Sequence, residues 1–282
     1  MARPLRIEYP GAVYHVTSRG NQRGAVFIEE GDRALFLSVL AETVDRFRLR
    51  CHAYCLMGNH YHLVLETLDA NLARAMRGLN GVYTQTFNRR HDKCGHVFQG
   101  RYGAVLIQRD SHLLEACRYV VLNPVRAGLA ATPQEWRWSS YGATAGLKAG
   151  PGFLTTAWLL AQFGDNLPEA RKKYVQFVAE GCDARIWDEL VSGIVLGSAS
   201  FAGRCRALVH MDGDTNEIPR NQHCAPRPGL VEILAGPGEN CEKWRRAVDV
   251  FGYTQKEVAG EMGMHYSYIS RVLKRERSKV KT

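Results

Sequence analysis

The sequence predicts an α+β fold: a ferredoxin-like split βαβ sandwich with an antiparallel sheet, plus an all-α C-terminal region that contains a helix-turn-helix. Two observations carry this prediction. Strand and helix patterns alternate through the first half in the order β-α-β-β-α-β, which is the order of a split βαβ unit. Near the C-terminus, two helical patterns are separated by Gly263. A chain of 282 residues is long enough to bury a separate core in each part.

The elements of the first half follow from hydrophobic periodicity and from turn residues. In chain order they are a strand at 12–18, a helix at 32–48, strands at 51–57 and 60–66, a helix at 71–90 and a strand at 103–108. Asp32 is expected to cap the first helix, and Gly58 with Asn59 to form the turn between the middle strands. The second helix has an apolar stripe: Leu72, Met76, Leu79, Tyr83 and Phe87. A third helix begins at Ser111 and is free to lie across the sheet.

Glycines between positions 142 and 152 indicate a boundary, so the sequence predicts three parts. Residues 1–145 form the α/β domain, 146–228 a helical region with a connector, and 229–282 the helix-turn-helix domain with a basic tail. In the middle part, residues 155–197 have helical patterns. Residues 198–228 are rich in Gly, Pro, Asn and Asp, which is typical of a connector.

The composition of the chain indicates the kind of partner and the cellular compartment to expect. The formal net charge of +9 favours an anionic partner. Abundant arginine suits nucleic acid, because guanidinium groups bind phosphates and guanine edges with two bonds at once; a GC-rich genome would also enrich arginine. The N-terminus lacks a signal-peptide core and no apolar run is long enough for a membrane helix, so we expect a cytoplasmic, nucleoid-associated protein. The eight cysteines contain no Cys-x-x-Cys pair, which argues against a zinc site or a disulfide framework.

Two histidines one residue apart, His60 and His62, are the most informative local feature. Alternate side chains of a strand point to the same face, so both imidazoles would lie side by side. Neutral imidazole is the commonest protein metal ligand, and two of them leave most of the coordination sphere open. The alternative is a pair of histidines that only form hydrogen bonds at a strand end.

The third helix carries the second candidate pair. Tyr119 and Asn123 are four residues apart and so share one helix face, and Pro124 is expected to stop the helix soon after. A tyrosine that attacks a phosphate needs a metal ion to offset the developing charge. Two imidazoles and an amide oxygen would form a three-ligand site that suits Mg²⁺ or Mn²⁺. Alternatively, Tyr119 is an ordinary packing residue of an amphipathic helix.

Five runs of residues resemble one known family. They are residues 14–21 (YHVTSRGN), 58–62 (GNHYH), 98–102 (FQGRY), 119–128 (YVVLNPVRAG) and 136–141 (WRWSSY). In this order they are similar to the REP-associated tyrosine transposases, relatives of the insertion-sequence single-tyrosine transposases among the two-histidine (HUH) endonucleases. The resemblance covers about the first 145 residues.

The resemblance implies a metal-dependent enzyme that cuts and rejoins single-stranded, hairpin-forming DNA. It assigns the metal to His60 and His62, the third ligand to Asn123, and the nucleophile to Tyr119. The tyrosine would form a 5′-phosphotyrosine link and release a 3′-hydroxyl. Three arginines near this site in sequence could bind phosphates or read guanine, or could be solvated surface residues: Arg101, Arg118 and Arg126.

The C-terminal segment predicts a second DNA-binding element. Thr254 and Glu257 form a capping box that begins one helix, and Gly263 forms the turn to a second helix at about 265–274. That helix would present four side chains to the major groove of duplex DNA: His265, Tyr266, Ser267 and Arg271. The alternative is a helical hairpin used for packing or for protein contacts.

These observations favour a transposase that acts on hairpin-forming repeats, as a monomer or a homodimer. A second reading is a domesticated transposase that regulates by sequence-specific DNA binding without productive cleavage. A nucleotide hydrolase of the histidine-triad class is a third, but that class expects another alternating histidine where this chain has Val64.

Overall fold

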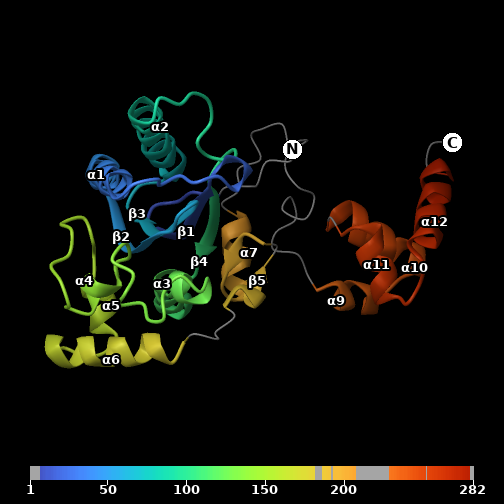
Figure 1. The fold of residues 1–282 in the computed structure, drawn as a ribbon. Coiled ribbons are helices and arrows are strands. Elements are labelled where there is room, and N and C mark those ends of the chain that lie inside the picture. Colours follow the sequence, from blue (N-terminus) through green and yellow to red (C-terminus); the bar gives the residue numbers. More distant parts are fainter. Residues whose placement is uncertain (1–6, 182–185, 192, 208–228, 252, 280–282) are drawn as a thin grey trace. The chain divides into compact units, whose positions relative to one another are not determined.

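The computed structural model describes residues 7–181, 186–191, 193–207, 229–251 and 253–279. The chain divides into two compact units, one formed by Glu8–Glu189 and the other by the residues from Leu190 onward together with Ile7. The first unit holds the α/β fold and the second holds the C-terminal helices (Figure 1).

The first unit is built on an antiparallel sheet with the strand order β2-β3-β1-β4. The strands are β1 (Ala12–Arg19), β2 (Leu49–Leu56), β3 (His60–Thr67) and β4 (Gly103–Ile107). Helices α1 (Glu30–Arg46) and α2 (Leu72–Arg90) connect them, and a short 3-10 turn, η1, spans Asn21–Arg23. This arrangement confirms the predicted α+β class and the predicted β-α-β-β-α-β order.

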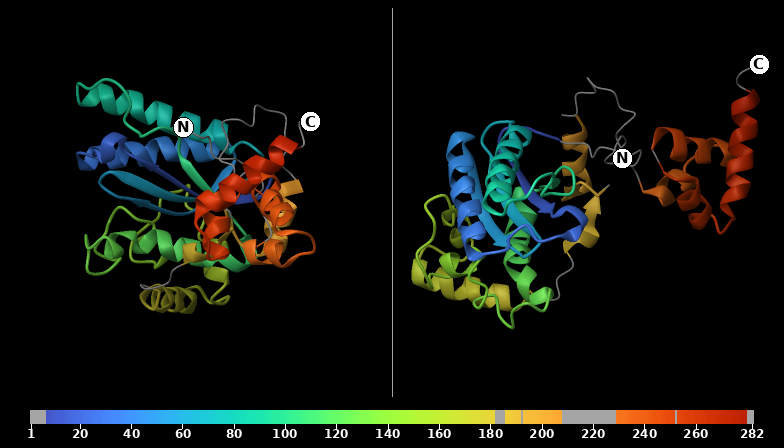
Figure 2. Two further views of the ribbon diagram at one scale, coloured as in Figure 1. Left: turned by 90° about the vertical axis from the view of Figure 1, so that its right-hand side faces the viewer. Right: turned by 45° about the horizontal axis from the view of Figure 1, so that its top comes forward.

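Alternation along the strands divides the core into two layers. Helices α1 and α2 cover one face of the sheet, and α3 (Arg109–Arg126) covers the other (Figures 1 and 2). Tyr61 of β3 points to the first face, where its ring lies 4.7 Å from that of Phe36 on α1. All five residues of the predicted apolar stripe on α2 are buried. The histidines of β3 therefore point to the face under α3.

The start of α1 differs from the prediction. Glu29 is the N-cap, and Asp32 is the third residue of the helix. The Asp32 carboxylate accepts the backbone N–H groups of Ile28 and Glu29 at 2.8 and 2.9 Å. Asp32 thus stabilises the helix terminus from inside the first turn instead of from the cap position.

The division of the chain does not coincide with the expected boundary after residue 145. Helices α4 (Tyr141–Thr144), α5 (Ala157–Ala161) and α6 (Leu167–Ala179) belong to the first unit. Their apolar side chains close the core over α3: Leu159, Leu160, Ala170, Tyr174 and Val178. The glycines near residue 150 therefore lie in a loop within one unit. The unit ends after a 3-10 turn, η2 (Ile186–Glu189).

The second unit begins where a helical pattern and a connector were expected. Strands β5 (Leu190–Val191) and β6 (Val195–Leu196) pair antiparallel, and α7 (Ala199–Ala207) follows them. The rest of the expected connector, 208–228, lies outside the described residues. Short β-branched runs of this kind fit either a strand or a helix when read from sequence.

The C-terminal helices form their own apolar core around Trp244, Val258, Ile269 and Leu273. They are α9 (Leu230–Ala235), α10 (Asn240–Arg245), a π-helical turn η4 (Arg246–Val250), α11 (Gln255–Glu261) and α12 (Tyr266–Lys279). The predicted capping box is present at α11, since Glu257 N–H donates to Thr254 Oγ1 at 3.1 Å and Thr254 N–H donates to the Glu257 carboxylate at 2.6 Å. Gly263 has φ = +63° in the turn, a conformation that glycine adopts without strain.

No helix in the described part of the chain is long and apolar enough to cross a membrane.

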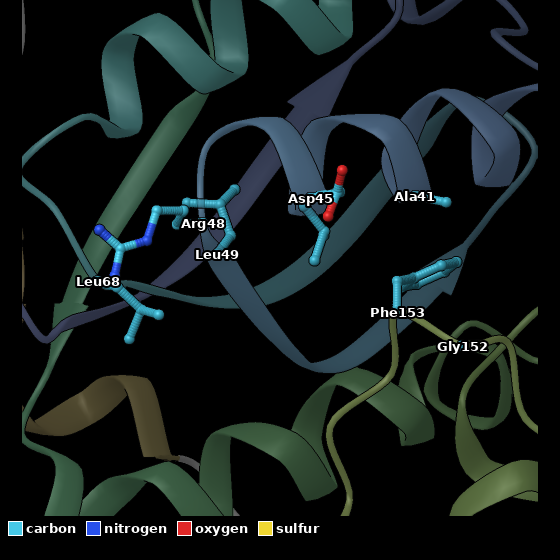
Figure 3. Close-up of a pocket in the computed structure, with 8 residues that line it drawn as sticks. Ala41, Asp45, Arg48, Leu49, Leu68, Gly152 and Phe153 are labelled. Carbon is cyan, nitrogen blue, oxygen red and sulfur yellow. The ribbon is translucent and has the colours of Figure 1, made fainter.

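A hollow of about 490 Å³ lies beside the C-terminal end of α1 (Figure 3). Its lining includes Asp45, Arg48, Leu68 and Phe153, and none of the candidate site residues.

Beneath the start of α3, a buried charge cluster ties the helix to the sheet. The Glu66 carboxylate, 2% exposed, accepts bonds from His52 Nε2 at 2.9 Å, Arg109 at 2.8 Å and Arg50 at 3.3 Å. Burial alone would raise the pKa of Glu66, but the His52 bond and the charges of Arg109 and Arg50 outweigh it and hold the pKa below its usual value.

We therefore expect Glu66→Gln to lower the free energy of unfolding at pH 7 by about 1–3 kcal/mol. A carboxylate whose pKa is lower when folded stabilises the fold above the unfolded-state pKa, and this stabilisation is lost as the pH falls through the folded-state pKa. The difference between wild type and Glu66→Gln should therefore shrink below the ordinary carboxyl pKa of 4.5. Urea unfolding between pH 7 and pH 3 measures this difference in the free energy of unfolding. Glu42→Gln, at an exposed position, is the control. A pH-independent difference would contradict the assignment.

Candidate active site

The two histidines lie at the start of β3, on the face under α3. His62 pairs with Thr17 on β1 and Cys55 on β2, so it occupies the middle of the sheet. The ring centroids of His60 and His62 are 5.0 Å apart, with planes 76° to each other. The predicted strand thus brings both imidazoles together.

His60 is oriented by its neighbour in the turn. Its Nδ1 lies 2.7 Å from Asn59 Oδ1, which leaves Nε2 available to another group. Partial burial and the nearby charge of Arg19 lower the pKa of His60. The ring is therefore held in the neutral form that binds metals.

His62 is almost fully buried, with 8% of its surface exposed. Its Nδ1 lies 2.9 Å from Nε2 of His15 on β1, whereas its Nε2 is buried without a hydrogen-bond partner. Burial, together with the neighbouring His15, His60 and Arg19, holds the pKa of His62 well below its ordinary value. A buried polar atom without a partner costs free energy, and a cation bound at Nε2 would offset that cost.

Helix α3 brings Tyr119 to the histidines. The Tyr119 ring is edge-on to His62, with centroids 6.1 Å apart, and edge-on to His15 at 5.9 Å. The tyrosine that the sequence singled out from twelve therefore lies against His62. Tyr61, by contrast, is on the opposite face of the sheet, where its hydroxyl donates to Asn80 at 2.7 Å.

The side chain of Asn123 is oriented by the proline that follows it. Helix α3 ends at Arg126, two residues after Pro124, as the sequence predicts. Proline has no N–H, so the carbonyl of Val120 lacks its usual donor four residues on. Asn123 Nδ2 donates to that carbonyl at 3.3 Å and to the carbonyl of Tyr119 at 2.9 Å. Because the amide nitrogen of Asn123 bonds the backbone, its side-chain oxygen can accept a hydrogen bond or bind a metal ion.

The three arginines differ in their surroundings. The Arg126 guanidinium lies 4.7 Å from the centre of the Tyr119 ring and donates to the carbonyl of Gly181 at 3.1 Å. Arg118 packs over the Phe177 ring at 4.1 Å and pairs with Glu115, which favours a packing role on the α6 side. Arg101 is exposed in the bend before β4. Only Arg126 is brought into contact with the catalytic candidate.

Sequence reasoning missed two residues of the site. His15 is not among the residues that the sequence singles out, but it bonds His62, and burial lowers its pKa to about 3. Trp187 of η2 stacks on His15, with centroids 4.7 Å apart and planes 26° to each other. Its ring is also edge-on to Tyr119 at 4.9 Å. No local pattern indicates Trp187, because it lies 68 positions after Tyr119 in a segment that reads as helical.

Among the described residues, no group of three His, Cys, Asp or Glu side chains could hold a metal ion. A site at His60 and His62 would therefore need its third protein ligand from an amide or hydroxyl oxygen. Asn123 fits that requirement by residue type and by the orientation of its amide.

The candidate DNA-contact residues of the C-terminal helices belong to the second unit. His265, Tyr266 and Arg271 are exposed, and Ser267 is half-buried. His265 Nδ1 lies 2.8 Å from Ser267 Oγ, which fixes the start of α12. Ile269 and Leu273 face the core, so the other side of α12 is presented to solvent.

Comparison with known proteins finds similarity to transposases in the first half of the chain. Residues 9–123 match the family described as IS200-like transposase. A protein of Haemophilus influenzae described as a REP-associated tyrosine transposase is 26% identical over 117 residues, which cover 38% of this chain and 66% of that protein. A solved structure of a REP-associated tyrosine transposase bound to a REP hairpin is 14% identical, with a TM-score of 0.46 over 55% of this chain and 92% of that one. The matched stretch contains both histidines, Tyr119 and Asn123, and residues 9–123 are therefore similar to the IS200-like transposase family.

Proposed function

We propose that this protein is a metal-dependent single-stranded DNA endonuclease and strand transferase that acts through a covalent 5′-phosphotyrosine intermediate. One observation carries the proposal: Tyr119 lies against His62, whose buried Nε2 has no partner. A tyrosine beside a metal-binding group is the arrangement that phosphoryl transfer to a hydroxyl requires.

Three side chains would hold the metal. His60 and His62 would each offer Nε2, and Asn123 its amide oxygen, which leaves positions open for phosphate oxygens. Mg²⁺ or Mn²⁺ suits this set better than zinc, because an open site with an oxygen ligand is expected of those ions. The bound ion would polarise the phosphorus and offset charge on its oxygens.

The chain's own residues supply the nucleophile and its surroundings. The Tyr119 oxygen attacks the phosphorus and loses its proton, the bond from phosphorus to the 3′ oxygen breaks, and the 3′ oxygen gains a proton. This leaves the 5′ phosphate on the tyrosine. The Arg126 guanidinium over the Tyr119 ring favours the negative charge that develops on the phenol oxygen. Attack by a 3′-hydroxyl on the phosphotyrosine reverses the step and joins strands.

Hairpin-forming repeats are the proposed DNA substrate. The formal charge of +9 favours a polyanion, and the related protein of Haemophilus influenzae is described as REP-associated. Acting on such repeats, the enzyme would work in the cytoplasm at the nucleoid. The alternative, a domesticated transposase that regulates by binding, would retain hairpin affinity without cutting.

The test is the covalent adduct. The full chain is incubated with end-labelled single-stranded hairpin DNA and Mn²⁺ and run on a denaturing gel. We expect a slowly migrating DNA–protein adduct that disappears when the metal is chelated. Binding without an adduct, across several hairpins and with both metals, would favour the regulator and contradict the enzyme.

We further propose that α11 and α12 form a helix-turn-helix that binds duplex DNA. The capping box, the Gly263 turn and the exposed side of α12 support this proposal. If Arg271 contacts a base, Arg271→Ala is expected to weaken duplex binding by about 1–3 kcal/mol. If Arg271 contacts a phosphate, the variant is expected to lower the salt dependence of binding by about one phosphate contact.

Titration of labelled duplex at several salt concentrations distinguishes these outcomes. Arg245→Ala, which removes an exposed arginine from α10, is the matched control. Equal loss in both variants would indicate general charge attraction and not a recognition helix.

A further inference from the structure

His15 and His62 form a hydrogen-bonded pair whose geometry is specific. Their nearest ring nitrogens, His15 Nε2 and His62 Nδ1, are 2.9 Å apart. The ring planes differ by only 8° and the centroids are 5.2 Å apart. Two rings at this separation that share one short nitrogen–nitrogen contact lie edge to edge in nearly one plane. This is the alignment in which an N–H points directly at the lone pair of its acceptor.

The bond has a consequence for His62. A neutral imidazole carries one proton, on either Nδ1 or Nε2. A proton on Nε2 would be buried without an acceptor, whereas a proton on Nδ1 is donated to His15. The second arrangement leaves the Nε2 lone pair of His62 free to bind a cation.

The surroundings hold His15 in the orientation that this bond requires. His15 is 6% exposed, and Trp187 stacks against its ring. Burial excludes water that would compete for the acceptor, and the stacking restricts rotation of the ring. Trp187 lies beyond residues 9–123, so a part of the chain outside the family match completes this support.

We propose that His15 is a positioning residue that accepts the Nδ1–H of His62 and so directs His62 Nε2 to the catalytic metal. This inference deepens the proposed function and rests on its metal site. Hydrogen-bond partners of metal-ligating histidines orient the ring and raise its basicity, and their loss typically lowers metal affinity by about 10–100-fold. A histidine that merely filled the core would have no such effect.

Metal affinity provides the test, measured by calorimetric titration of the full-length protein with Mn²⁺. His15→Phe keeps an aromatic ring against Trp187 but removes the acceptor, and we expect its Mn²⁺ affinity to fall by about 10–100-fold. His15→Gln places an amide oxygen near the position of Nε2 and should restore affinity to within about threefold. His52→Gln changes another buried histidine of the sheet, which bonds Glu66, and should bind Mn²⁺ as wild type does.

The outcomes separate this inference from the proposed function. If the wild-type protein binds no Mn²⁺, the metal site fails. If wild type binds and folded His15→Phe binds equally well, His15 has no positioning role. Should His15→Phe not fold, nitrogen-15 spectra of the Mg²⁺-loaded wild type decide: we expect His15 Nε2 to lack a bonded proton and to couple to His62 Nδ1–H across the hydrogen bond. A proton bonded to His15 Nε2 would overturn the proposal.

Discussion

Tyr119→Phe is expected to abolish the covalent DNA adduct, with a loss of at least about 10³-fold in cleavage rate. The substitution removes only the attacking oxygen. The contacts that position residue 119 belong to its ring: His62, His15 and Trp187 at its edges and Arg126 over its face. Hairpin affinity should therefore stay within about twofold of wild type, because no phosphate-binding group is lost.

Tyr61→Phe is the matched control, since it removes a tyrosine hydroxyl from the face of the sheet opposite α3. Its adduct yield should equal that of wild type wherever the protein remains folded. The measurement is the yield of labelled adduct against time for the three proteins, with hairpin binding followed in parallel. An adduct that persists in Tyr119→Phe would show that another residue is the nucleophile.

Much of the fold could be predicted because its signals are local. Strand β3 alternates polar and apolar positions over most of its length, and the stripe on α2 repeats at helical spacing. Where prediction failed, distant contacts decided the structure. The glycines near residue 150 resemble a domain linker, yet Leu159 and Tyr174 are needed to bury α3, so the unit continues past them.

In the candidate site, too, local spacing could be predicted from the sequence, whereas contacts between distant residues could not. The spacing of His60 and His62, and of Tyr119 and Asn123, follows from the periods of a strand and a helix. The bond between His15 and His62 depends on the pairing of β1 with β3, in which His15 lies opposite Val64. Sequence spacing carries no information about that register. The helix ends soon after Pro124, as predicted, but the bond from the Asn123 side chain to the carbonyl that the proline leaves without its usual donor is visible only in the structure.

Replacing both His60 and His62 by alanine should eliminate metal-dependent cleavage. Loss of a hydrogen-bond partner of a ligand already lowers metal affinity by about 10–100-fold, so loss of two ligands should lower it by more than about 100-fold. Tyr119 would remain, but without the metal nothing offsets charge on the phosphate. Mn²⁺ titration and hairpin cleavage measure the two effects, with the exposed loop variant His96→Ala as the control.

The single variants should differ, because the two histidines have different surroundings. His60 is partly exposed and its Nδ1 bonds only the neighbouring Asn59, so water can enter the space that His60→Ala creates. His62 is buried between β1 and β2, and its removal also leaves His15 without its partner. We therefore expect His62→Ala to lose more metal affinity and more folding stability than His60→Ala. Equal losses in both, or cleavage by the double variant under strict chelation, would contradict the assignment of the metal to this pair.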